Sequence, residues 1–197
     1  MKTWLAALCA AAAFVLAGCQ PASHAPSFKA TDITGATFGR DFRLTDHNGH
    51  VRSLVDFRGK VVALFFGYTH CPDVCPTTLA DFAAALKQLG PQAAQVQVLF
   101  VTLDPERDTP ALLRQFVPAF DPSFLGMYTD SGALAALANE FKVVYQKTSV
   151  KGADDYLIDH SAGTYVYDPK GNLRLLIPYG SSAADIAHDL KALLAAP

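Results

Sequence analysis

Two cysteines, Cys71 and Cys75, lie four positions apart in the stretch GYTHCPDVCP, and a proline follows each of them. Thiolate is both the nucleophilic form of cysteine and the form that binds metals. A thiol pair at this spacing could exchange with a disulfide, react with a peroxide or bind a soft metal ion. A cross-link that closes so short a loop removes little entropy from the unfolded chain, so we favour chemistry over a structural disulfide.

The three chemistries make different demands on the neighbouring residues. Dithiol–disulfide exchangers usually have two residues between their cysteines, whereas three separate Cys71 from Cys75. The run Cys75-Pro76-Thr77-Thr78 is similar to the peroxiredoxin run around the reactive cysteine, but Pro72 stands where that family has a threonine. Two thiolates select Cu(I) or Zn, and one imidazole would complete a small copper site.

The segments around the pair predict a strand, a turn and a helix. The continuous apolar run Val61–Phe66 is typical of a strand buried on both faces. Helical spacing of apolar residues predicts a helix over Thr77–Leu89. Pro76 suits the first helical position, with Cys75 at or before the N-cap. The free N–H groups and the positive end of the helix would then favour thiolate at Cys75.

The rest of the chain continues the alternation of strands and helices, which predicts an α/β sheet with crossover connections. A cysteine pair between a central strand and the next helix indicates a thioredoxin-like fold. We expect an N-terminal β-hairpin around Asn48-Gly49, a late β-hairpin extension and a closing helix after Ser182. The remaining expected elements are a strand at 96–103, a helix from Pro110, a helix at 134–141, and strands at 143–147, 156–160, 164–167 and 173–177.

Six histidines could supply an imidazole. His160 is favoured because it follows a polar loop (151–155) and enters a late strand, which in this fold approaches the cysteine helix. A hydrogen-bonded histidine at a strand end is the common alternative. The other candidates are weaker: His70, whose ring could point away from the sulfurs; His47 and His50, expected to be solvated at a turn; His188, expected on an exposed helix side; and His24, in the N-terminal tether.

Three blocks together resemble the Sco/SenC proteins: GYTHCPDVCPTTL (67–79), VTLDPERDTP (101–110) and YLIDHSAGTYVYD (156–168). The similarity runs from about Phe38 to Leu194. The resemblance implies a membrane-anchored thioredoxin-like domain that binds copper. It further implies a metallochaperone, with no substrate turnover of its own, that helps to assemble the binuclear copper centre of cytochrome c oxidase. The family's metal ligands fall on Cys71, Cys75 and His160.

A second function remains open beside this one. The same sulfurs could act as a thiol–disulfide reductase that keeps the copper-ligand cysteines of the oxidase reduced. The expected partners are the copper-bearing subunit of the oxidase and possible periplasmic copper chaperones or thiol reductases. Three nearby residues receive structural interpretations: Asp104 shapes a turn, Asp159 points away from the His160 ring, and Met127 fills the core.

The N-terminus predicts export and a lipid anchor. Lys2 precedes an apolar run that is too short for a transmembrane helix of roughly 20 apolar residues. Leu16-Ala17-Gly18-Cys19 resembles a bacterial lipobox, which implies a signal peptide at 1–18 and lipidation of Cys19. We expect a flexible tether at 19–38 and one folded domain at 39–197, held at the membrane in the cell envelope, outside the cytoplasm.

Charge excludes one further class of partner. The 197 residues carry a net charge of −2, and no basic stripe is present in the sequence. We therefore expect no nucleic-acid binding.

Overall fold

The computed structural model of the chain describes residues 27–150 and 155–196. The expected signal peptide, the lipidation site Cys19, the first part of the tether and most of the polar loop at 151–155 lie outside these residues.

Within the described residues, eight strands form the main sheet, in the order β1-β10-β9-β4-β5-β6-β2-β3. The central strands β4, β5 and β6 are parallel, and β9 joins β4 in antiparallel register. The parallel strands place the carboxyl ends of β4 and β5 at one edge, where sites in such sheets are found. The strands are β1 (Thr31–Asp32), β2 (Arg43–Asp46), β3 (Val51–Ser53), β4 (Val61–Gly67), β5 (Val96–Thr102), β6 (Leu125–Tyr128), β9 (Thr164–Tyr167) and β10 (Leu173–Ile177).

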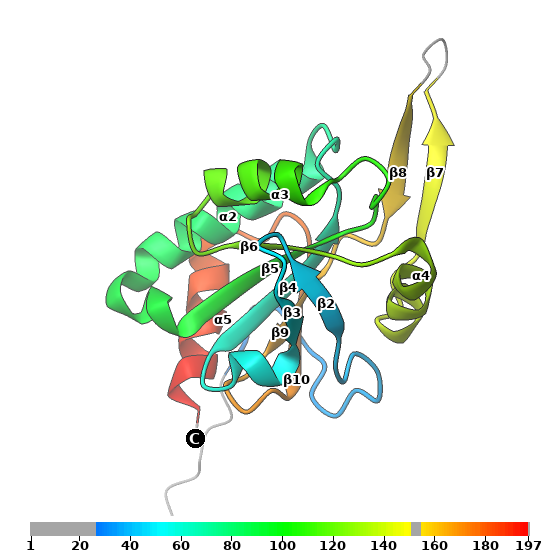
Figure 1. Cartoon of the computed structure of the whole chain (residues 1–197). Helices are drawn as coiled ribbons and strands as arrows, with labels where there is room; N and C mark the ends of the chain where they lie inside the picture. The colour runs from blue at the N-terminus through cyan, green and yellow to red at the C-terminus, as the bar shows by residue number, and fades with distance from the viewer. Residues whose placement is uncertain (1–26, 151–154, 197) are drawn as a thin grey trace, which may run out of the picture.

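A separate two-stranded sheet projects from the body of the domain (Figure 1). It consists of β7 (Tyr145–Ser149) and β8 (Tyr156–His160), which pair antiparallel. The β9–β10 hairpin is the late extension expected from the sequence, and β2–β3 is the expected N-terminal hairpin. The pairing of β7 with β8 as a second, projecting hairpin was not predicted. The fold is thus the predicted thioredoxin-like α/β arrangement.

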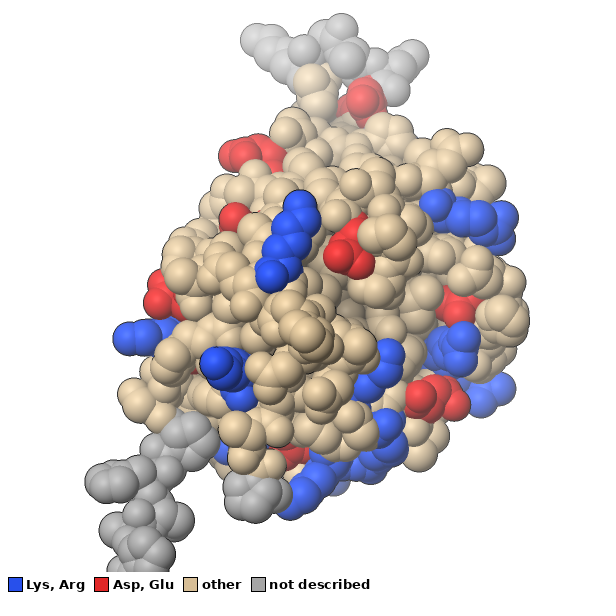
Figure 2. Space-filling model, turned by 90° about the vertical axis from the view of Figure 1, so that its left-hand side faces the viewer, with Lys and Arg blue, Asp and Glu red and all other residues tan. Residues whose placement is uncertain are grey.

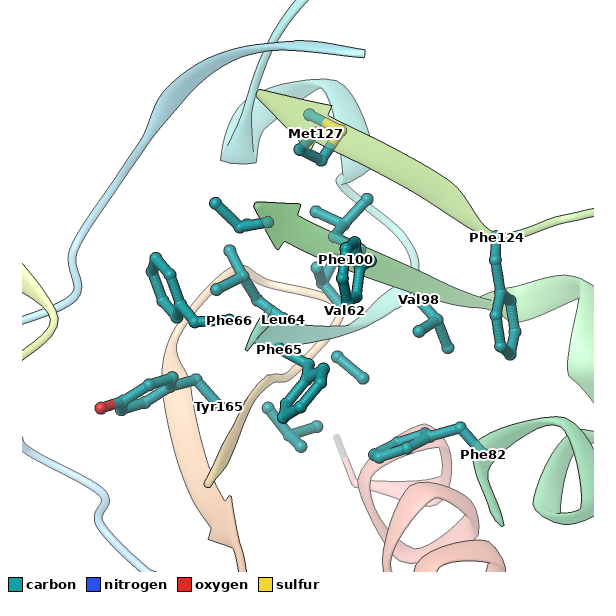
Figure 3. Packing of buried hydrophobic residues seen from close by; sticks show 14 of the residues in the cluster. Val62, Leu64, Phe65, Phe66, Phe82, Val98, Phe100, Phe124, Met127 and Tyr165 are labelled. Carbon is teal, nitrogen blue, oxygen red and sulfur yellow. The ribbon is translucent and has the colours of Figure 1, made fainter. Parts of the chain in front are cut away.

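Helices cover both faces of the sheet. Helices α2 and α5 pack against each other, and Phe82 of α2 lies on the same side of β4 as Phe65 (Figure 3). Phe66 points to the opposite face, where its ring centroid lies 5.2 Å from that of Phe141, at the end of α4. The helices are α2 (Val74–Leu89), α3 (Pro110–Phe116), α4 (Ser131–Glu140) and α5 (Ala183–Ala195), with 3-10 turns η1 (Leu54–Phe57), η2 (Gly90–Gln95) and η3 (Val117–Ala119).

The core is centred on β4 and β5, in which every residue is buried. This confirms the prediction from the apolar run, since a strand covered on both faces needs no polar alternation. Met127 is fully buried in β6, as expected for core filler. Strand β6 itself was not predicted, because four residues are too few for a clear periodicity.

The boundary predicted between tether and domain lies too late in the sequence. Residues 28–38, assigned to the tether from their composition, pack on the domain, and β1 pairs with β10. The backbone N–H groups of Lys29 and Ala30 donate to the buried carboxylate of Asp189 in α5, at 2.8 and 2.7 Å. These hydrogen bonds join the N-terminal backbone to a helix far along the chain, so the local composition could not predict them.

Basic and acidic side chains both occur across the face shown in Figure 2, with wide uncharged areas between them. Among the described residues, no helix combines the length and the apolar character needed to cross a membrane.

Candidate metal centre

The two cysteines occupy different environments at the start of α2. Cys71 lies in the β4–α2 loop and is half-buried, whereas Cys75 is completely buried in the first turn of the helix. The backbone N–H of Cys75 points at Cys71 Sγ, at 3.4 Å. Both thiols are free. The short loop therefore brings the two sulfurs to the same helix end, as the sequence predicted.

The helix begins earlier than predicted, and this changes the expectation for Cys75. Asp73 is the N-cap, so Cys75 is the second helical residue and Pro76 the third. Proline is tolerated there because the first four N–H groups of a helix lack intrahelical partners. Burial raises the pKa of Cys75, and the nearby Cys71 raises it further. The predicted preference for thiolate at Cys75 is therefore wrong for the metal-free protein, because desolvation outweighs the field of the helix.

A glycine allows Cys75 to approach the end of β4. A Cβ atom on Gly67 would lie 2.8 Å from Cys75 Sγ and 2.8 Å from the ring of Phe100. Both distances are too short for any side chain, so only glycine fits between the thiol and the core. Gly67, the last residue of β4, thus allows the Cys75 thiol to pack against the core.

His160, at the end of β8, lies beside the buried thiol. Its Nε2 atom is 3.6 Å from Cys75 Sγ, and its Nδ1 atom is 2.9 Å from the carbonyl oxygen of Ser161. Since a carbonyl only accepts, Nδ1 carries the proton and the Nε2 lone pair faces the sulfur. Burial lowers the pKa of His160, which favours this neutral form. A neutral imidazole whose second nitrogen is held by a hydrogen bond is typical of a metal ligand.

Cys71 and His160 border one hollow, whereas Cys75 is buried behind it, so the three side chains do not enclose a finished site. The hollow has a volume of about 310 Å³, and its lining includes Tyr68, Cys71, Pro72, Val74, His160 and Ala162. Within residues 27–150 and 155–196, no three His, Cys, Asp or Glu side chains are gathered closely enough to hold a metal ion. A metal held by this set would therefore require the three side chains to come closer together.

The other histidines that the structure describes contact groups other than the sulfurs. His47 is buried and its Nδ1 accepts from the backbone N–H of Gly126 at 3.0 Å, so the prediction of a solvated turn residue is wrong for it. His50 is exposed, as expected, beside Asp46. His70 contacts the Thr69 hydroxyl, half-exposed His188 contacts Asp189, and His24 lies outside the described residues.

Polar residues of the β5–α3 loop support the site, and our reading of the sequence missed most of them. Asp108 is buried and accepts from Thr69, which precedes the cysteine loop. Asp104 was expected only to shape its turn, but its carboxylate also accepts from the Tyr156 hydroxyl at 2.8 Å. Asp159 accepts from Thr148 and so points away from the His160 ring, as predicted. Asp104 and Asp108 both belong to the block VTLDPERDTP, and this block was the signal in the sequence that could have identified them.

The fold and the site define a class of protein: a thioredoxin-like domain with a CxxxC pair at the mouth of a helix and a histidine beside it. The SCO1/SenC family model matches residues 30–195. The chain therefore belongs to the SCO1/SenC family.

Individual relatives agree with this assignment. The bovine mitochondrial SCO2 homologue is 38% identical over 158 residues, which are 79% of this chain and 59% of the relative. The chain thus matches less than two thirds of that protein's length.

Two solved structures are also similar. ScoI of Bradyrhizobium japonicum with copper bound is 37% identical with a TM-score of 0.71, and the match covers 79% of this chain and 98% of that one. Apo Sco1 of Thermus thermophilus is 40% identical with a TM-score of 0.75, covering 85% and 97%.

Proposed function

We propose that this protein binds copper through Cys71, Cys75 and His160 and transfers it to the copper-bearing subunit of cytochrome c oxidase during assembly. The observation that carries the proposal is the unprotonated Nε2 of His160, 3.6 Å from Cys75 Sγ. Two comparisons support it: the similar ScoI contains copper, and the Sco family is described as one of cytochrome c oxidase assembly proteins.

The donor set fits a soft ion. Two sulfurs and one imidazole suit Cu(I), while Cu(II) prefers a tetragonal set and would need a further donor such as water. Burial holds the proton on Cys75 in the metal-free protein, so copper must displace it. Binding thus releases protons, and Cys71, the more exposed thiol, is the natural point of first contact and of transfer.

Copper delivery in the cell envelope would require export and a membrane anchor, and the N-terminal segment can supply both. We infer a signal peptide at 1–18, a lipid on Cys19 and a tether that ends where the chain packs on α5 near Lys29. The copper site would then face a membrane-bound partner on the outer side of the cytoplasmic membrane.

A second candidate is the reduction of the partner's cysteines. Cys71 Sγ lies 3.4 Å from the backbone of Cys75, and both thiols are free. Thiolate attack by Cys71 on a target disulfide would form a mixed disulfide and release one target thiol. Cys75 would then attack Cys71 Sγ, closing the disulfide in this chain and releasing the second target thiol. This chemistry does not require His160.

Copper titration of the purified, reduced protein tests the proposal, with His50→Ala as the control because His50 is exposed and remote from the sulfurs. We expect Cys71→Ala and Cys75→Ala to abolish tight Cu(I) binding. His160→Ala should weaken Cu(II) binding and remove its imidazole signal, and His50→Ala should change neither. Absence of copper binding by the reduced wild-type protein would overturn the proposal.

Reduction of a disulfide-bonded peptide that carries the oxidase copper-ligand cysteines separates the two functions. A reductase should lose its activity in Cys71→Ala and keep it in His160→Ala. Loss of copper transfer in His160→Ala, with peptide reduction unchanged, would assign the histidine to copper delivery.

A further inference from the structure

Arg107, in the β5–α3 loop, binds the first residues of the hairpin that carries His160. Its Nε donates to the carboxylate of Asp104. Its Nη1 donates to the Asp155 carboxylate at 2.6 Å and to the Tyr156 carbonyl oxygen at 3.0 Å. The guanidinium also lies 3.6 Å from the centroid of the Tyr156 ring. One side chain therefore contacts the start of β8 through its carbonyl, its neighbouring carboxylate and its ring.

Asp104 completes this contact from the core side. Its side chain is wholly buried and accepts from the Tyr156 hydroxyl at 2.8 Å as well as from Arg107. A buried carboxylate requires such partners, because an uncompensated charge is costly to desolvate. Asp104, Arg107 and Tyr156 thus form one connected group, which we call the Arg107 clamp.

The geometry of β8 connects the clamp to the metal centre. Side chains alternate along a strand, so Tyr156, Ile158 and His160 share one face. Ile158 is 3% exposed and packs in the core, whereas Leu157 and Asp159 face outward. Tyr156 is held by the clamp at one end of this face, and His160 lies against Cys75 at the other. A shift or rotation of the strand at Tyr156 would therefore move His160.

No sheet pairing joins the hairpin to the body of the domain in the part of the chain that the structure describes, since β8 pairs with β7 in a separate sheet. Its attachments to the body include the side-chain contacts of the clamp, of Ile158 in the core, and of the His160 ring against Phe65 and Tyr68. Figure 1 shows the pair projecting from the domain. The position of His160 therefore depends on side-chain contacts from β8 rather than on sheet hydrogen bonds to the core.

We propose that Arg107 is a positioning residue for the metal centre: together with Asp104 it holds Tyr156, and thereby fixes β8 so that His160 lies next to Cys75. The role in copper binding rests on the proposed function, while the placement of His160 in the metal-free protein does not.

Three variants test the clamp. Arg107→Lys keeps the positive charge but loses the forked donors and the planar stacking. Tyr156→Phe keeps the ring and removes only the hydroxyl that Asp104 accepts. Lys147→Met is the matched control, because Lys147 is a second cation over the same ring, at 4.6 Å, in an exposed pair with Glu106.

The metal-free measurements are amide hydrogen exchange of residues 156–160 and the nuclear Overhauser contact between the His160 ring and Cys75. We expect Arg107→Lys and Tyr156→Phe to speed exchange in β8 and to weaken the ring contact, while exchange in β4 and β5 stays at the wild-type rate. Lys147→Met should resemble the wild type. Wild-type exchange and an unchanged ring contact in both clamp variants would overturn the proposal.

The copper measurement is the imidazole nitrogen coupling of bound Cu(II), observed by pulsed electron paramagnetic resonance. We expect the coupling to decrease in both clamp variants while copper stays bound to sulfur. If the wild-type protein lacks the coupling, the ligand set in the proposed function is wrong, and the metal-free measurements still decide the clamp. A full wild-type coupling in both clamp variants contradicts the clamp alone.

Discussion

Asp108 accepts two hydrogen bonds from Thr69, one from the backbone N–H at 3.0 Å and one from the hydroxyl at 2.6 Å. A third comes from the hydroxyl of Thr102 at 2.6 Å. The buried carboxylate therefore ties the segment that enters the cysteine loop to the end of β5. Because the Arg107 clamp starts in the same loop, one short segment contacts both the cysteine side and the histidine side of the site.

We predict that Asp108→Asn destabilises the protein and loosens the cysteine loop. The amide has the shape of the carboxylate, but its NH₂ group would face hydrogen-bond donors, leaving buried groups unsatisfied. Such a loss costs about 1–3 kcal/mol. Urea unfolding of the reduced protein measures the change, and amide exchange at Thr69 and Cys71 shows where it acts.

Glu106→Gln is the control for Asp108→Asn, because it removes a negative charge from the same loop. Glu106 forms an exposed ion pair with Lys147, and such pairs contribute roughly 0–1 kcal/mol. Its unfolding midpoint should stay near that of the wild type. Equal destabilisation by both variants would show that the loop's charge matters rather than the Asp108 hydrogen bonds.

The main elements could be predicted because their signals are local. The apolar runs of β4 and β5 require burial on both faces, and Asn48-Gly49 fixes the first hairpin through a glycine at φ 90°. Ser182 caps α5 as predicted, with its side chain accepting from Asp185 N–H. By contrast, β1 and the early end of the tether depend on contacts with β10 and α5, which no local pattern contains.

The residues of the candidate site came from the sequence, but their environment did not. The sequence brought Cys71, Cys75 and His160 forward through motif and family resemblance, and the structure places His160 beside Cys75. The sequence could not show that Cys75 would be desolvated, because the burial of its thiol depends on Gly67 and on Phe100, which is distant in the sequence. The hydrogen bonds of Asp108 and Arg107 could not be predicted either, because they connect segments that lie far apart in the sequence.

We predict that Gly67→Ala disturbs the candidate metal centre through packing alone. The added methyl would meet Cys75 Sγ and the Phe100 ring, each at 2.8 Å, and neither can retreat in a filled core. Overpacking of this kind typically costs 1–3 kcal/mol, so we expect a loss of about that size. Urea unfolding and Cu(I) affinity should both decrease.

Gly132→Ala provides the comparison for Gly67→Ala. Gly132 lies in α4, where its Cβ would meet only an oxygen of the Asp130 side chain, at 3.2 Å. Alanine in a helix is favoured over glycine by roughly 0.5–1 kcal/mol, so stability should hold or rise. Unchanged copper affinity in Gly67→Ala would contradict the close packing of Cys75 against the strand.

We predict unequal reactivity of the two thiols in the reduced, metal-free protein. Cys75 is completely buried and burial raises its pKa, whereas Cys71 is partly exposed. Iodoacetamide should therefore label Cys71 much faster than Cys75 at neutral pH. Mass spectrometry of Cys71→Ser and Cys75→Ser measures each rate separately, and urea-unfolded protein should label both equally. Faster labelling of Cys75 in the folded protein would refute its burial.

We predict that His47 makes folding stability depend on pH below neutrality. Burial lowers the pKa of His47 from 6.5, which outweighs the opposing effect of Asp46. The unfolded chain therefore takes up a proton that the folded state resists, so stability is present above about pH 6.5 and is lost as the pH falls toward the folded pKa. One such group contributes a slope of up to about 1.4 kcal/mol per pH unit in this window.

The urea midpoint of the reduced protein between about pH 7.5 and pH 5 measures this slope. His47→Asn retains an acceptor for the N–H of Gly126 and has no proton to gain, so its stability should vary less with pH than that of the wild type. A residual slope is expected because burial also lowers the pKa of His160. If His47→Asn also keeps the full slope, the buried imidazole is not its origin, and His160 becomes the group to change next.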